Sequence, residues 1–296
     1  MNKMTSLTKM MLSSAPVCAP LVLDPLMARL AEDAGFKALY LGGGATGYLR
    51  IYLEANLTLT EMAQMAIEIR TVTSLPLILD AAAGWGDPMH MHRTMGMTEA
   101  AGFAAIEIED QILPKRAHHH LGIEHMVPMD FMVEKVKEAV RARRNPETHI
   151  IARTNAMRAS NIDDAIRRCE AYRKAGADSL LLIPYTSETA RYVGERLEPP
   201  LVNILRPGGL AALGMTANDL YGCGFRLLID PATPLLAAYE AMKKTYAELA
   251  DGFSIKSRPP EDWARLQTEQ HKTINLQKLI DIEKRTTEIP RDRAQP

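Results

Sequence analysis

Short apolar runs alternate with longer amphipathic segments along most of the chain. Eight such runs cover residues 17–23, 38–41, 76–80, 105–109, 149–153, 179–183, 201–204 and 225–229. The main helical candidates cover residues 25–34, 59–72, 89–101, 129–143, 162–175 and 234–248, and several end in an Ala-Gly step that suits a left-handed helix C-terminus. This alternation predicts parallel strands joined by crossover helices.

Eight strand–helix units within residues 1–250 predict an α/β fold, a (β/α)8 barrel of the TIM type. A doubly wound open sheet is the competing architecture, but no G-x-G-x-x-G motif follows the first run. After residue 251 the strand pattern stops, and residues 261–285 are helical in composition. We therefore expect a barrel with a helical lead-in over residues 1–250 and a C-terminal helical extension over residues 251–296, with residues 291–296 disordered.

The composition is typical of a soluble enzyme. Of 296 residues 47% are hydrophobic, the formal net charge is -1, and no basic cluster points to a nucleic-acid partner. No apolar run approaches the roughly 20 residues that span a bilayer, so no membrane partner is expected. The N-terminus lacks an apolar signal core, and Cys18, Cys169 and Cys223 lack metal-ligand spacing. We expect a cytoplasmic protein with reduced thiols.

Charged residues stand at the ends of three consecutive predicted strands, namely Asp80, Glu109 and Arg153. Because chemistry in parallel α/β proteins is placed at the C-terminal strand ends, we expect these side chains to share one mouth. Paired carboxylates can hold a hard cation such as Mg²⁺, and a guanidinium can grip a substrate carboxylate with two hydrogen bonds. The alternatives are structural: Asp80 caps its own turn, and Glu109 pairs with Lys115 or Arg153.

Four motifs follow one another along these segments. They are DAAAGWG at residues 80–86, IEDQ at 108–111, KRAHH at 115–119 and IARTNA at 151–156. They match the D-A-D-x-G-Y-G, I-E-D-Q, K-[KR]-C-G-H and I-A-R-T-[DN]-A patterns of the isocitrate lyase and phosphoenolpyruvate mutase superfamily. Over residues 15–250 the chain resembles the short members of the 2-methylisocitrate lyase and 2,3-dimethylmalate lyase kind.

The resemblance implies a Mg²⁺ site in which Asp80 is the direct ligand and Glu109 acts mainly through water. It implies that substrate is bound by Arg153, by the amide of Asn203 and by backbone N–H groups of the turn Gly42, Gly43 and Gly44. It also implies that the loop beginning at Lys115 and Arg116 closes over the substrate and supplies acid groups.

Three departures from the family pattern bear on the chemistry. Ala82 replaces a carboxylate, so we expect weak metal binding that the substrate assists, with Glu54 as a possible substitute ligand. Gly42 replaces a serine that usually opens the glycine turn. Ala117 replaces the cysteine associated with proton delivery, and the following histidines, with His118 and His119 as candidates, could supply an imidazole. The alternative for the histidine triplet is a solvated polar loop.

We therefore expect a lyase that acts on a small substituted malate through an enolate. Decarboxylation or hydrolysis of an oxaloacetate-like substrate is the first alternative, because loss of CO₂ gives the same enolate without that cysteine. A non-catalytic binding or scaffold barrel is the second. Since members of the family commonly exchange a helix of this C-terminal region between subunits, the resemblance also implies a homodimer or homotetramer. The alternative is a helical tail that folds on its own subunit.

Overall fold

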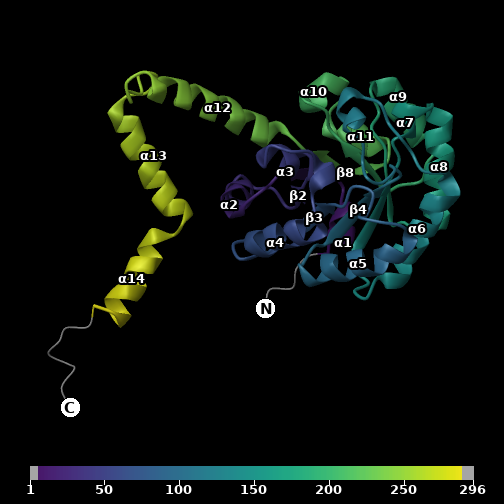
Figure 1. The fold of residues 1–296 in the computed structure, drawn as a ribbon, viewed down its shortest axis with the longest axis horizontal. Coiled ribbons are helices and arrows are strands. Elements are labelled where there is room, and N and C mark those ends of the chain that lie inside the picture. Colours follow the sequence, from purple (N-terminus) through teal and green to yellow (C-terminus); the bar gives the residue numbers. More distant parts are fainter. Residues whose placement is uncertain (1–5, 289–296) are drawn as a thin grey trace, which may run out of the picture. The chain divides into compact units, whose positions relative to one another are not determined.

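The computed structural model describes residues 6–288, and its main body is a barrel of eight parallel strands surrounded by helices (Figure 1). The strands are β1 (Val17–Pro20), β2 (Leu39–Leu41), β3 (Leu77–Asp80), β4 (Ala105–Glu109), β5 (His149–Arg153), β6 (Ser179–Leu181), β7 (Leu201–Ile204) and β8 (Phe225–Asp230). Their order is β1-β8-β7-β6-β5-β4-β3-β2, and a parallel bridge between Leu21 and Tyr40 joins the two ends. The predicted (β/α)8 barrel is confirmed.

Helices fill the connections between the strands. The α-helices are α1 (Leu7–Met11), α2 (Pro25–Asp33), α3 (Gly43–Leu49), α4 (Leu59–Arg70), α5 (Met91–Ala100), α6 (Met129–Ala142), α7 (Ala156–Ala159), α8 (Ile162–Lys174), α9 (Ser187–Gly194), α10 (Gly209–Leu213), α11 (Ala217–Gly222), α12 (Thr233–Ala250), α13 (Pro260–Thr273) and α14 (Leu276–Thr286). The described residues also form three 3₁₀ turns, which are η1 (Glu54–Asn56), η2 (Pro88–His90) and η3 (Ala117–Leu121).

Local sequence explains where the long crossover helices begin. The Asp24 carboxylate accepts from the backbone N–H of Met27 at the start of α2, and the Asn161 side chain caps α8 in the same way. Thr58 and Glu61 form a reciprocal capping box at the start of α4. Each cap satisfies backbone N–H groups that have no partner within the helix.

The strands separate two apolar layers. Side chains such as Ile78 and Ile151 fill the inside of the barrel, where Leu7 and Met11 of α1 pack against them. Thr8 of α1 also contacts His149 at the first position of β5, so α1 covers the N-terminal end of the barrel. The second layer lies between the outer side of the strands and the surrounding helices. With one end covered, the C-terminal strand ends remain as the place for a site.

Two strands are shorter than expected by more than one residue. The first was predicted to reach residue 23 but ends at Pro20, and beyond it the N–H groups of Leu21 and Val22 bond to Asp230 and Tyr40 across the barrel closure. The sixth was predicted to reach residue 183 but ends at Leu181, shortly before Pro184, which has no N–H to donate.

The C-terminal segment forms a unit of its own, since the contacts divide the chain into Met1–Leu236 and Ala237–Pro296. The stretch predicted to be helical after residue 261 contains α13 and α14, which are separated at Asn275, a residue with a left-handed backbone at φ 58°. The disorder predicted for residues 291–296 concerns a segment outside the described residues. Between residues 6 and 288 no helix combines the length and apolar character needed to cross a membrane.

Candidate functional site

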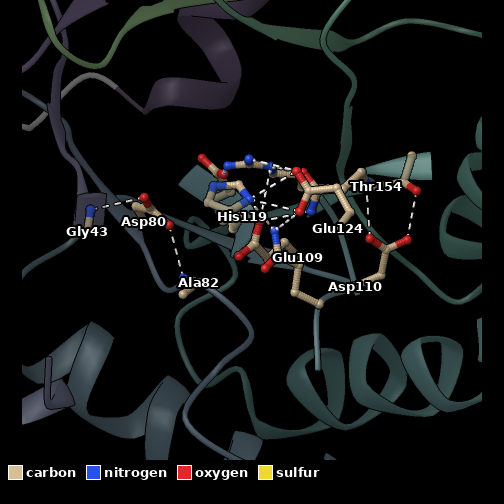
Figure 2. Close-up of polar contacts among 12 residues, drawn as sticks. Gly43, Asp80, Ala82, Glu109, Asp110, His119, Glu124 and Thr154 are labelled. Atoms are coloured by element: carbon tan, nitrogen blue, oxygen red, sulfur yellow. Dashed lines mark hydrogen bonds and ion pairs between the residues drawn. The ribbon is translucent and has the colours of Figure 1, made fainter. Parts of the chain in front are cut away.

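The charged strand ends lie side by side as the sequence suggests. In the sheet register Asp80 pairs with Glu107, and Glu109 pairs with Arg153. The residues two positions earlier, Ile78, Ala105 and Ile151, pack inside the barrel, so strand alternation turns these charged side chains inward as well. Figure 2 shows the contacts of Asp80 with Gly43 and Ala82, and a separate group of contacts that includes Glu109 and His119.

Asp80 holds two loops in place with its two carboxylate oxygens. Oδ1 accepts from the backbone N–H of Ala82 at 3.0 Å, and Oδ2 accepts from Gly43 at 2.9 Å (Figure 2). Asp80 therefore caps its own turn, as the structural alternative proposed. Each oxygen keeps a second lone pair, so this role leaves capacity for a metal ion.

Glu54 joins the site from η1. The loop before it packs against Gly47, where a Cβ would stand only 2.7 Å from the backbone nitrogen of Glu54. Glycine at this position thus lets the loop approach α3 closely. Burial, together with the nearby charges of Asp80 and Glu109, raises the pKa of Glu54, although Lys115 opposes the shift. The structure brings this possible substitute ligand into the acidic group.

Lys115 bridges two buried carboxylates. Its Nζ lies 2.5 Å from Oε1 of Glu54 and 2.7 Å from Oε1 of Glu109. The second oxygen of Glu109 accepts from Asn155 Nδ2 at 2.9 Å. Burial opposes the ionisation of Glu109, but the ammonium of Lys115 and the guanidinium of Arg153 lower its pKa below the usual range. Glu109 is thus engaged in the salt bridges expected as the alternative to metal contact.

Arg153 is held from two sides. Its Nη1 donates to Oε1 of Glu107 at 2.9 Å, and its Nη2 and Nε donate to Oδ1 of Asn155 at 3.1 and 3.3 Å. A guanidinium has five N–H groups, so one on Nη1 and one on Nη2 make no hydrogen bond within residues 6–288. Those two donors are available to a carboxylate.

Sequence reasoning missed Glu107 and Tyr40. Glu107 is buried, and the Tyr40 hydroxyl donates to its Oε2 at 3.0 Å. Burial, with the charge of Asp80 added, raises the pKa of Glu107 to about 7 in spite of Arg153. A signal was present, because the alternation Ile106-Glu107-Ile108-Glu109 places both glutamates on one face of the strand.

The histidine triplet lies in η3 and points in three directions. His119 Nδ1 lies 2.8 Å from Oε2 of Glu124, while its Nε2 lies 3.8 Å from Oε1 of Glu54. His120 contacts the Tyr48 hydroxyl at 2.7 Å, and His118 contacts His125. Of the three, only His119 faces the acidic group.

Burial lowers the pKa of His119 to about 4, and the charge of Lys115 adds to this effect. The imidazole is therefore neutral near pH 7. The side chain of Glu124, which also contacts Arg158, is fully buried on the other side of the ring and fixes its orientation. Arg116 is exposed, so the roles suggested for Arg116 and His118 stay predictions.

The donor set fits a metal ion only in part. Within residues 6–288 no group of three or more His, Cys, Asp and Glu side chains is arranged to hold one. Two carboxylates nevertheless converge, because a Cβ on Gly43 would stand 3.3 Å from Glu54 Oε2 and 3.4 Å from Asp80 Oδ2. Mg²⁺ is commonly bound by one or two carboxylates together with substrate oxygens and water. A cation completed by the substrate fits these residues, whereas one held by protein side chains alone does not.

The charge balance agrees with this assignment. The buried group contains the carboxylates of Glu54, Asp80, Glu107 and Glu109 against the cations of Lys115 and Arg153. When all are ionised, negative charge is in excess, and an excess buried away from water is unfavourable. A divalent cation would offset it.

The remaining predicted substrate contacts are less direct. The N–H of Gly43 in the turn Gly42–Gly44 is already donated to Asp80. Asn203 pairs in the sheet with Leu228, whose side chain packs in the outer layer, and it borders a small cavity beside α10. Its buried Nδ2 has no hydrogen-bond partner in the described part of the chain. The roles of the turn and of Asn203 stay predictions.

Comparison with known proteins identifies a family. The model of the family described as phosphoenolpyruvate phosphomutase matches residues 7–250. The chain is 35% identical to 2-methylisocitrate lyase of Aeropyrum pernix over 93% of this chain and 87% of the relative. It is 32% identical to 2,3-dimethylmalate lyase of Eubacterium barkeri, over 84% and 86% respectively. It is 31% identical to oxaloacetate decarboxylase of Rhodopseudomonas palustris strain CGA009, over 85% and 86%.

Solved structures agree with the barrel. Phosphoenolpyruvate phosphomutase from Streptomyces platensis subsp. rosaceus superposes with a TM-score of 0.85 at 26% identity, covering 95% of this chain and 98% of that one. Oxaloacetate acetylhydrolase in complex with 3,3-difluorooxalacetate has a TM-score of 0.81 at 29% identity, covering 94% and 95%. Phosphonopyruvate hydrolase in complex with oxalate and Mg²⁺ has a TM-score of 0.82 at 25% identity, covering 97% and 100%.

Proposed function

Because the chain belongs to the PEP mutase/isocitrate lyase superfamily, we propose that it cleaves a carbon–carbon bond in a small carboxylate that resembles a substituted malate. The observation that carries the proposal is Arg153, whose guanidinium is held by Glu107 and Asn155 and keeps two N–H donors for a ligand. A buried cation fixed in this way, at the C-terminal end of a strand, suits a substrate carboxylate.

The proposed reaction needs a base and a proton return. Removal of the 2-hydroxyl proton lets the oxygen electrons form the carbonyl of a 2-oxo acid, while the neighbouring C–C bond breaks and its electron pair remains on carbon as an enolate. His119 lies between Glu124 and Glu54 and is the group proposed to accept the hydroxyl proton, and the resulting imidazolium can return it to the enolate carbon. With this role for His119 the cysteine replaced by Ala117 is not needed.

The proposal includes a Mg²⁺ ion whose coordination is completed by oxygens of the substrate. Asp80 and Glu54 would hold it, with Glu109 contributing through water, and it would act as a Lewis acid that stabilises negative charge on the enolate oxygen. Lys115 bridges Glu54 and Glu109, and its ammonium offsets part of their negative charge. The glycine turn 42–44 and Asn203 remain proposed substrate contacts.

Oxaloacetate-type decarboxylation or hydrolysis is the second candidate. Ala117 favours it, because release of CO₂ generates the enolate without prior proton transfer at that position, and one relative is an oxaloacetate decarboxylase. A barrel that binds such acids without turnover is the third candidate.

A thermal-shift screen tests the proposal. Substituted malates, 2-oxo acids and phosphonates are added with and without Mg²⁺, since a ligand that binds the folded state raises its stability. Products from each stabilising acid are then identified by mass spectrometry. We expect a malate to be cleaved. We expect Arg153→Ala to bind that malate at least about tenfold more weakly than the wild type, the usual scale for the loss of a charge-assisted contact. CO₂ release from oxaloacetate alone would support the second candidate, and binding without products the third.

We also propose that the protein is a cytoplasmic homodimer or homotetramer that associates through the unit Ala237–Pro296. This unit exposes apolar side chains that include Tyr246 and Phe253, which are 69% and 87% exposed. No residue of α12, α13 or α14 is buried within this chain, and contiguous exposed apolar patches are typical of contact surfaces. Light scattering of the intact chain and of a double Tyr246→Ser, Phe253→Ser variant tests association, which the variant should weaken.

A further inference from the structure

A buried chain of hydrogen bonds lies next to the guanidinium of Arg153. Tyr40 of β2 donates to Glu107 of β4, and Glu107 accepts from Arg153 of β5. Tyr40 and Glu107 are each 1% exposed, whereas Arg153 is 8% exposed. The two inner residues are therefore placed to act on a ligand only through the third.

We propose that Glu107 and Tyr40 are positioning residues that set the direction and the effective charge of Arg153 toward a substrate carboxylate. This inference rests on the proposed function, in which Arg153 binds that carboxylate. Tyr40 fixes one oxygen of Glu107, the other oxygen fixes Nη1, and the free N–H groups of Arg153 are thereby given one orientation.

Glu107 acts in two opposing ways. Its hydrogen bond restrains the guanidinium, which favours binding because less freedom is lost when the ligand arrives. Its negative charge offsets part of the positive charge of Arg153, which weakens attraction for an anion. Glu109, whose Oε2 lies 3.3 Å from Arg153 Nε, offsets more of it, and Asp80 lies close enough to influence Glu107. Glu107 thus orients the guanidinium of Arg153 but lowers its attraction for an anion.

Two substitutions separate these effects. In Glu107→Gln the amide oxygen can still accept from Arg153 and the amide N–H₂ can donate to the Tyr40 oxygen, so the geometry is kept and the charge is lost. In Glu107→Ala both are lost. The difference in ligand affinity between the wild type and Glu107→Gln measures the effect of the charge. The difference between Glu107→Gln and Glu107→Ala measures the effect of the positioning.

The experiment measures oxalate affinity at saturating Mg²⁺ by calorimetry. We expect Glu107→Gln to bind oxalate about threefold to tenfold more tightly than the wild type, and Glu107→Ala to bind about tenfold more weakly than Glu107→Gln. Equal affinities of the Gln and Ala variants would overturn the positioning role. Tyr40→Phe, which keeps the ion pair, should lose about threefold and provides a second test if Glu107→Ala fails to fold.

A double-mutant cycle shows whether the effect passes through Arg153. In an Arg153→Ala background Glu107→Gln should leave oxalate affinity unchanged, and a persisting gain would assign the effect to the metal side of the site and overturn the inference. If Arg153→Ala alone leaves affinity unchanged, the proposed function fails instead. Ser179→Ala, which alters a buried hydroxyl at the other end of the barrel, is the matched control and should not change oxalate affinity.

Discussion

The indole N–H of Trp85 donates to the backbone carbonyl of Leu57 at 2.9 Å. This bond ties the turn after Asp80 to the loop that carries Glu54, and these two carboxylates are the ones proposed to share a metal ion. The turn has unusual geometry, since Ala82 and Trp85 both have left-handed backbones, at φ 45° and 56°. Lys135 also supports it by donating to the Ala83 carbonyl at 2.7 Å.

Trp85→Phe should therefore weaken the site as well as the fold. The ring is kept and one hydrogen bond is lost, so we expect about 1 kcal/mol less stability and about threefold weaker oxalate binding with Mg²⁺. Denaturant unfolding and calorimetry measure the two effects. Trp263→Phe, in α13, is the control, because it removes the second tryptophan from the unit Ala237–Pro296. Unchanged oxalate binding in Trp85→Phe would remove the proposed coupling between the loops.

Ala82→Asp should strengthen metal binding. It restores a carboxylate beside Asp80, and the left-handed backbone at Ala82 is one that Asp and Asn adopt more readily than other residues. Because cation affinity rises with the number of anionic ligands, we expect about tenfold tighter Mg²⁺ binding in the absence of substrate. Ala82→Asn serves as the uncharged control. Equal Mg²⁺ titrations for the Asp and Asn variants would place Ala82 away from the metal.

His149 predicts acid sensitivity of the fold. Burial at the N-terminal end of the barrel lowers its pKa from 6.5 to about 4, in spite of the nearby charge of Asp178. The folded state therefore binds its proton less readily than the unfolded state. The contribution to stability is complete above pH 6.5 and is lost as the pH falls toward 4.

The loss amounts to about 3 kcal/mol over that interval, from 1.36 kcal/mol per pKa unit. Denaturant unfolding across the interval measures it, and His149→Gln, which cannot titrate, is the reference. The difference in stability between wild type and variant should change steeply below pH 6.5. A difference that stays constant with pH would contradict the assignment.

The sequence was sufficient for the barrel and for the main charged residues. Asp80, Glu109 and Arg153 each end an apolar run, and parallel strands bring such ends together. Glu54 was harder to place, because its position depends on the close approach of its loop to Gly47. No strand pattern in the sequence predicts that contact. Glu107 could have been found from strand alternation, but it lies before the matched motif and has no family role attached to it.

Side-chain pairing could not be read from the sequence in the same way. Lys115 is six positions after Glu109, yet its bridge to Glu54 depends on the path of two loops. The histidine triplet gave His118 and His119 as candidates, and the distinction between them comes from the Glu124 side chain beside His119. Tertiary contacts of this kind follow from the fold and have no local periodicity.

The three histidines should therefore differ in their effect on turnover. His119 lies between Glu124 and Glu54, whereas His118 and His120 contact other parts of the protein surface. We expect His119→Ala to lower the rate of cleavage by about 10²-fold or more, the usual scale for acid–base assistance, with a smaller effect on substrate affinity. Single-turnover measurements on the acid found in the thermal screen provide the rates. His118→Ala and His120→Ala are the matched controls and should stay within about threefold of the wild type, since neither ring faces the carboxylates. If all three variants cleave at the wild-type rate, another group carries the proton. The presence of Ala117 is then better explained by decarboxylase activity, which needs no such acid at bond cleavage.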